Sequence, residues 1–158
     1  MLERVNPMSI NCQLQKIVNK IDLKIERATK EIISTIKEKL KEALYEYWYD
    51  KYDPIDYKRS FDLISAVDGE IVKNSRGNYS ISVFINPKLL SAEYSPGMWS
   101  THMGFAGENF REGLIYSILH GVSGSKLNPR LGDSANVIEV VQEEATRYAN
   151  SILKQYLK

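Results

Sequence analysis

The feature that most constrains the fold is an apolar stripe at helical spacing that no proline or glycine interrupts between Leu14 and Tyr47. Steps of three and four residues place these side chains on one face of a helix, and lysine and glutamate fill the opposite face. The pattern predicts one helix of up to about 40 residues, which would be about 55 to 60 Å long. The stripe consists of Leu14, Val18, Ile21, Ile25, Ala28, Ile32, Ile36, Leu40, Ala43 or Leu44, and Tyr47.

The predicted helix is too long to lie entirely on its own domain. A compact domain of 158 residues is only about 35 to 40 Å across. Either the helix breaks near Ala28 and Thr29, or its first half projects and buries the start of the stripe on another subunit. We favour projection, because a sharp break normally has a cause such as a proline or a glycine. The predicted partner contacts on this helix are Leu14, Val18, Ile21 and Ile25.

The predicted domain organisation follows from this helix. We expect an N-terminal arm at residues 1–9, which contain Asn6-Pro7 and no periodicity, and a single α+β domain at residues 10–158. Within it, residues 10–30 are predicted to project as an oligomerisation helix.

A corner should follow the long helix at Asp53-Pro54. Proline disfavours helical backbone at the residue before it, so the helix should stop near Tyr52. Beyond the corner, polar and apolar residues alternate from Tyr57 to Leu63, which fits the start of a strand or a short helical turn. The aromatic residues on both sides, including Tyr52 and Tyr57, are expected to form a structural cluster that braces the helix.

A β-hairpin is predicted after the corner. Tyr79 to Ile85 alternates in period two, and the turn residues at Ser75–Asn78 separate it from a strand at Glu70–Lys73. Asp68-Gly69 has the composition of a further turn. We expect a small antiparallel sheet of about three strands, too small to be stable without a helix on one face.

Two loops follow the hairpin. The first, at residues 91–108, has apolar side chains that need cover, either from a partner surface or, for Trp99 and Phe105, from the sheet itself. The second, at residues 121–134, has a glycine-rich composition but not the spacing of a phosphate-binding loop. The predicted partner contacts in the first loop are Met98, Trp99, Met103 and Phe105.

Two more helices complete the expected fold. Asn109 to His120 has helical spacing and ends at Gly121, a suitable C-cap. His120 then lies in the last turn, where a structural role is expected because the helix dipole favours a protonated imidazole there. Ala135 to Leu157 forms a well-patterned core helix. The fold class is therefore α+β, with the long N-terminal helix and the C-terminal helix packed on a small antiparallel sheet.

Composition argues against several classes of function. The 21 basic and 20 acidic residues nearly cancel, which indicates neither a nucleic-acid footprint nor a membrane-surface patch. Cys12 is the only cysteine, so an internal disulfide or a multi-cysteine zinc site is excluded. The N-terminus lacks the apolar core of a signal peptide, and no apolar run approaches a membrane span, so we expect a soluble intracellular product.

A catalytic site is not indicated. His102, Glu108 and His120 could be imagined as a hydrolytic or metal-binding set, but they are scattered and lack the close spacing that fixes metal geometry on one element. We expect no enzyme activity, no cofactor and no metal.

The segment from Tyr52 to Leu63 reads YDPIDYKRSFDL, after a tyrosine-rich helix and before a hairpin. It resembles the Y-x-P-x-x-Y-x-R-[TS]-x-x-L pattern of minor tail, or tail-completion, proteins of long-tailed phages. The matching residues are Tyr52, Pro54, Tyr57, Arg59, Ser60 and Leu63.

A looser echo of the same family follows the later helix, at Leu119-His120-Gly121, so the resemblance spans roughly residues 45–124. Two positions depart from the family pattern: Ser60 stands where threonine is commoner, and His120 precedes Gly121 instead of following it.

The resemblance implies a structural protein of the virion neck. Copies would form a ring between head and tail, with a hexamer favoured over a dodecamer, and would contact neighbouring neck, portal-side and tail proteins. It implies a protein made in the host cytoplasm and found in the virion, with no membrane and no sequence-specific nucleic acid as partner. The alternative is a small phage-encoded inhibitor or adaptor that binds one host protein through the two exposed loops.

Overall fold

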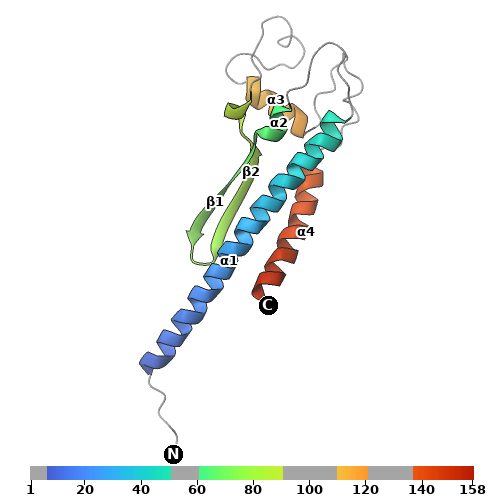
Figure 1. The fold of residues 1–158 in the computed structure, drawn as a ribbon. Coiled ribbons are helices and arrows are strands. Elements are labelled where there is room, and N and C mark those ends of the chain that lie inside the picture. Colours follow the sequence, from blue (N-terminus) through green and yellow to red (C-terminus); the bar gives the residue numbers. More distant parts are fainter. Residues whose placement is uncertain (1–6, 51–60, 91–109, 121–136) are drawn as a thin grey trace, which may run out of the picture.

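The long N-terminal helix is the axis of the structure. The computed structural model describes residues 7–50, 61–90, 110–120 and 137–158. Helix α1, Pro7–Leu44, is flanked by helix α4, Val137–Leu157, and by a hairpin of β1, Val67–Ser75, and β2, Asn78–Ile85 (Figure 1). The fold is α+β, as predicted, with both long helices and the antiparallel sheet in the expected order.

Short elements gather where α1 ends. A π-helical turn, η1, Tyr45–Tyr49, continues α1, and the backbone N–H of Asp50 donates to the carbonyl of Tyr45 at 2.8 Å. Helix α2, Asp62–Ser65, precedes the hairpin, and the 3-10 turn η2, Pro87–Leu89, follows it. Helix α3, Phe110–Leu119, lies beside α2 at the same end of the molecule (Figure 1).

Helix α1 is continuous, as projection requires. The alternative of a break near Ala28 and Thr29 is wrong, because both residues are buried inside a regular helix and the Thr29 hydroxyl donates to the carbonyl of Ile25 at 2.8 Å. The helix begins at Pro7, three residues before the predicted start at Ile10. Proline suits the first turn of a helix, since its missing N–H would have no partner there.

The described sheet has two strands, not about three. They pair in antiparallel register from Val67 opposite Ile85 to Ser75 opposite Asn78. Gly77 turns the hairpin with φ of 72°, which agrees with the predicted turn. The predicted turn at Asp68-Gly69 is wrong, since both residues lie within β1.

Gly69 is needed for close packing, not for a turn. A Cβ at this position would lie 3.0 Å from Ile33 Cδ1 on α1 and 3.0 Å from the backbone oxygen of Ser82 on β2. The Ser82 oxygen belongs to the paired strand and cannot move without disturbing the ladder. The glycine therefore lets the hairpin approach α1 closely.

Replacing Gly69 by alanine should lower the free energy of unfolding by about 1 to 3 kcal/mol, as expected for overpacking at a close contact. Denaturant unfolding of the purified protein measures this. Ser82→Ala, on an exposed position of β2, is the matched control and should change the free energy by less than about 0.5 kcal/mol. Equal stability of the two variants would show that the hairpin can shift freely on α1.

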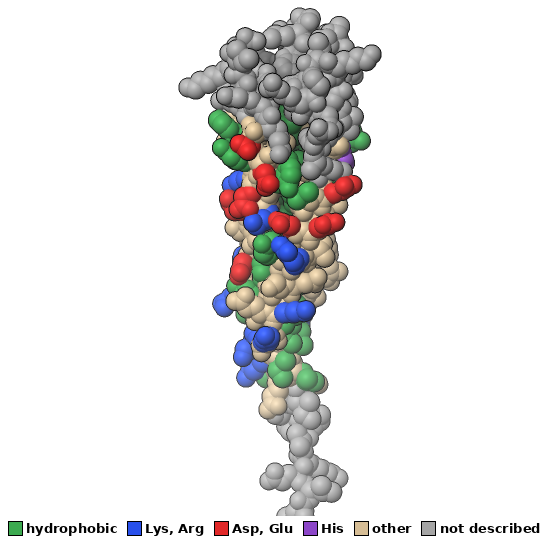
Figure 2. All heavy atoms as spheres, turned by 90° about the vertical axis from the view of Figure 1, so that its right-hand side faces the viewer, with side chains coloured by type: hydrophobic (Ala, Val, Ile, Leu, Met, Phe, Trp, Pro, Cys, Tyr) green, Lys and Arg blue, Asp and Glu red, His purple; other side chains and the backbone are tan. Residues whose placement is uncertain are grey.

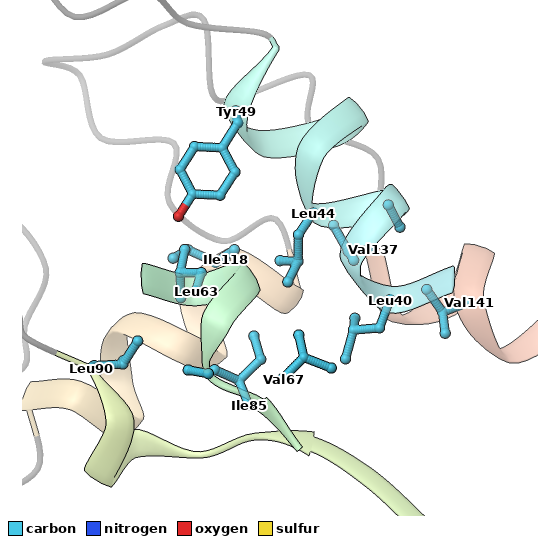
Figure 3. Close-up of a cluster of buried hydrophobic side chains, with 12 residues drawn as sticks. Leu40, Leu44, Tyr49, Leu63, Val67, Ile85, Leu90, Ile118, Val137 and Val141 are labelled. Atoms are coloured by element: carbon cyan, nitrogen blue, oxygen red, sulfur yellow. The ribbon is translucent and has the colours of Figure 1, made fainter. Parts of the chain in front are cut away.

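The core lies at the end where the short elements meet (Figure 3). Leu44, Ile118 and Val137 are almost fully buried there, from three different helices. Leu63, a residue of the family-like pattern, lies in the same cluster with 7% of its surface exposed. The cluster consists of Leu40, Ala43, Leu44, Tyr49, Leu63, Ala66, Val67, Ile85, Leu90, Ile118, Val137 and Val141.

A second, smaller cluster joins the middle of α1 to the end of α4. Ala28 and Ile32 pack against Ile152, and Ile81 of the hairpin packs against the same group. The Tyr156 hydroxyl donates to Glu31 Oε2 at 2.7 Å, so the carboxylate at the acceptor raises the pKa of Tyr156. These contacts set how far along α1 the domain reaches.

The predicted aromatic cluster at the corner is described in part. The rings of Tyr49 and Phe61, from either side of the corner, lie 4.8 Å apart between centroids. Tyr52, Pro54, Tyr57 and Arg59 lie outside the described residues. The predicted bracing contact is therefore seen for the pair that the structure describes.

Candidate assembly surface

The N-terminal part of α1 extends beyond the rest of the described chain (Figure 1). The hairpin turn reaches α1 at Asp22, and the last turns of α4 reach it at Glu31. Residues 11–21 are all exposed. We call the segment Pro7–Ile21 the tip; at 1.5 Å per residue it is about 22 Å long.

The tip has an apolar face that the described chain does not cover. The predicted contacts Leu14, Val18 and Ile21 are 53%, 38% and 44% exposed. Ile17, inside the tip, and Leu23, just after it, are each 55% exposed. Leu14, Ile17, Val18 and Ile21 lie on one side of the helix and make a surface of the kind that usually marks an interaction site, whereas Leu23 lies on the opposite side.

The apolar face ends where the domain begins. Ile25, the fourth predicted contact, is half-buried, and its Cδ1 lies 3.7 Å from where a Cβ of Gly77 would stand. Ile32 is only 4% exposed, because Ile152 of α4 covers it. The surface open to a partner is therefore shorter than the sequence stripe and centred on Val18.

A clamp fixes the hairpin turn to the base of the tip. Asp22 Oδ1 accepts hydrogen bonds from the Gly77 backbone N–H at 2.8 Å and from the Tyr79 hydroxyl at 3.1 Å. Asp22 Oδ2 pairs with Lys73 Nζ at 2.7 Å. The Lys73 hydrogen bond, with help from the Gly77 N–H, lowers the pKa of Asp22, and the same pair raises the pKa of Lys73. The clamp marks where the tip leaves the domain.

This clamp predicts a pH dependence. Because the pKa of Asp22 is lower in the folded chain than its ordinary value of 3.8, its contribution to stability is present above that value and is lost as the pH falls through the lowered pKa. Asp22→Asn should lower the melting temperature at pH 7, and the difference from wild type should shrink below about pH 4. Thermal melting from pH 7 to pH 3 measures this, with Asp50→Asn as the control at an exposed aspartate. If the melting temperatures of Asp22→Asn and wild type differ by the same amount from pH 7 to pH 3, the ionised Asp22 carboxylate does not stabilise the fold through this clamp.

The other predicted site residues fall into two groups. His120 follows α3, half-buried, and its ring lies 4.3 Å from that of Tyr116, which suits the structural role expected of it. The remainder lie outside the described residues, so their roles stay predictions. They are Met98, Trp99, Met103, Phe105, Tyr52, Pro54, Tyr57, Arg59 and Gly121.

Sequence reasoning missed three residues of this region. Ile17 follows Leu14 by three residues and precedes Ile21 by four, so the same spacing could have found it, whereas Leu23 lies on the other side of the helix, outside the stripe. Asp22 finds its partners 51 to 57 residues away. No local sequence pattern predicts contacts over such a distance. The one signal is that an aspartate beside a predicted apolar face usually has a hydrogen-bond or ion-pair partner.

Two kinds of site were sought in the described residues. Across the four described segments, no group of three or more histidine, cysteine, aspartate or glutamate side chains could hold a metal ion. Within the same segments, no helix combines the length and apolar character needed to cross a membrane. Comparison with sequence models of known protein families, with curated proteins and with solved structures finds no match to this chain.

Proposed function

We propose that this chain is a structural subunit that assembles through the tip of α1, as a neck or tail-completion protein that forms a ring between the head and tail of a phage-like virion. The observation that carries the proposal is the apolar face of Leu14, Val18 and Ile21, which projects past the domain and is exposed. The assignment to a virion neck rests on the sequence pattern from Tyr52 to Leu63.

An exposed face of this kind favours association. Covering a side chain such as Leu, Ile or Val contributes about 1.5 to 3 kcal/mol when burial is complete, and the tip side chains are already partly covered by their own helix. Four partly exposed side chains can still outweigh the entropic cost of association when several copies contact one another. A repeated contact, as in a ring, adds these contributions at every interface.

The continuity of α1 supports a structural role. The tip belongs to the same helix that contributes residues to both core clusters. The position of the tip relative to the compact end is therefore fixed by one continuous helix. Its partners in a virion would be further copies of the chain and the neighbouring neck, portal-side and tail proteins. The proposed role needs no catalytic group.

Imaging of particles tests the proposal. Particles from the producing cell are purified, the chain is located with an antibody, and the labelled position is compared between complete particles and particles made without the chain. The proposal predicts label at the head-to-tail junction, and heads and tails that fail to join when the chain is absent. Normal joining without the chain, with the chain recovered bound to one host protein, would instead support an inhibitor or adaptor.

A further inference from the structure

The tip keeps its charges away from its apolar face. Its charged residues are Lys16 and Lys20, and at about 100° of turn per residue they lie about 110° to 150° from the centre of that face. Both are exposed. In the view of Figure 2, basic and hydrophobic side chains, but no acidic ones, are seen toward the free end of α1. A surface that covers the apolar face therefore has to offer apolar side chains and not negative charge. The apolar face consists of Leu14, Ile17, Val18 and Ile21.

Amide side chains border the apolar face. Asn11 and Gln15 lie along one edge of it and Gln13 along the other, and all three are exposed. Amides carry no net charge, and they both donate and accept hydrogen bonds. The apolar face and its borders can therefore meet an identical surface without placing like charges against each other.

The packing of α4 shows which kind of element fits this side of α1. Val141 shares the core cluster of Leu40 near the compact end, and Ile152 packs on Ile32, nearer the tip, so α4 runs antiparallel to α1 (Figure 1). The apolar face of the tip continues the same stripe of α1, but α4 ends at Leu157 and does not reach it. An antiparallel helix is thus the natural cover for the part of the stripe that α4 leaves open.

We propose that the tip of a second copy of this chain covers the apolar face, with the two tips antiparallel around a two-fold axis. This inference rests on the proposed function and names the partner at its contact. Each tip lies beside the other copy's α1 as α4 does farther along the same helix. The contact uses the same patch on both copies, as a two-fold interface requires.

One register covers both apolar faces completely. When the axis passes between Ile17 and Val18, Leu14 of each copy lies opposite Ile21 of the other, and Ile17 lies opposite Val18. All four apolar side chains of each tip then meet apolar side chains. A shift of one helical turn in either direction leaves one turn of each face uncovered.

The lysines stay apart in this register. Lys16 comes level with Asn19 of the other copy, and Lys20 comes level with Gln15. The lysines also point away from the contact, on the far sides of two helices whose axes are about 8 to 10 Å apart. At about 0.1 M salt, repulsion between exposed charges is largely screened beyond about 10 Å. The pairing is therefore not opposed by the positive charge of the tips.

A parallel pair of tips is less favourable. The hairpin turn lies against Ile25, and α4 covers Ile32, so this side of α1 is occupied from the base of the tip onward. Two parallel copies that faced each other with this side would bring their hairpins and α4 helices into the same space. Antiparallel tips place the two domains at opposite ends of the pair.

The pairing limits the number of copies in an assembly. A two-fold contact is complete after two copies, so a ring needs a further contact between pairs. The number of copies is then even, and a ring of six contains three pairs.

Cysteine cross-linking tests the pairing and its direction. Cys12, the only cysteine, is first replaced by serine; it lies on the side of the helix away from the apolar face. In this background Val18→Cys, next to the axis, should form a covalent dimer at least about tenfold faster than Leu14→Cys, whose two copies lie about 10 Å apart along the helices. A mixture of Leu14→Cys and Ile21→Cys chains should form the mixed dimer. Non-reducing electrophoresis of the purified full chain under mild oxidation measures this.

The control and the outcomes separate this inference from the proposed function. Leu89→Cys, 55% exposed and outside the tip, should give no covalent dimer. If wild type assembles but Leu14→Cys cross-links with itself as fast as Val18→Cys, the tips are parallel, and the inference fails while the proposed function stands. The same holds if wild type assembles and no cysteine in the tip cross-links. A wild type that stops at two copies supports the pairing and overturns the ring, and one that stays monomeric overturns both.

Discussion

We expect Val18→Asp with Ile21→Asp to abolish the proposed assembly and to leave the domain folded. Both side chains lie in the exposed face of the tip and outside either core cluster, so the substitutions remove no core contact. In the assembly they place two unpaired carboxylates where apolar contact is expected, which costs far more than the lost methyl groups. We expect an affinity loss of at least about 100-fold by sedimentation, with an unchanged circular dichroism spectrum.

The matched control is Leu89→Asp with Leu157→Asp. These leucines are 55% and 51% exposed, at least as much as Val18 and Ile21, but they lie outside the tip. The control should add the same two charges and still assemble. If the tip variant unfolds, the tip packs on its own domain and the proposal is wrong. If both variants assemble normally, the apolar face of the tip is not a contact.

Truncating Leu44 should have the largest effect on stability. Leu44 is 0% exposed and lies in the core cluster where the end of α1 meets α2, α3 and α4. Leu44→Ala removes buried methyl groups and leaves a cavity, so we expect the free energy of unfolding to fall by about 2 to 5 kcal/mol. Chemical denaturation of the chain measures it.

Leu89→Ala is the control for that substitution. Its side chain is 55% exposed, so the same truncation should cost less than about 0.5 kcal/mol. A cost below about 1 kcal/mol for Leu44→Ala would show that the compact end collapses easily around the missing side chain. It would also weaken the claim that this end is a rigid base for the tip.

The long elements could be predicted because their patterns are local. The unbroken stripe of α1, the period of two in β2 and the glycine turn at Gly77 each follow from neighbours in the sequence. The exposure of Leu14, Val18 and Ile21 could be predicted from the length of the helix alone, since a domain of this size is too short to cover the whole helix.

The errors arose where contacts are distant in sequence. The Asp68-Gly69 pair is typical of a turn, yet Gly69 lies within a strand. A glycine is needed there because Ile33 and the Ser82 backbone oxygen leave no room for a Cβ. The end of the exposed stripe could not be placed, because it depends on how far Ile152 and the hairpin turn reach along α1.

Light scattering of the purified wild-type chain over a wide range of protein concentration tests the central claim most directly. The account predicts a defined multiple of the 18.1 kDa chain mass, with six copies favoured, that dissociates as the protein is diluted. A mass of 18.1 kDa at every concentration, with the tip exposed and the chain folded, would contradict it.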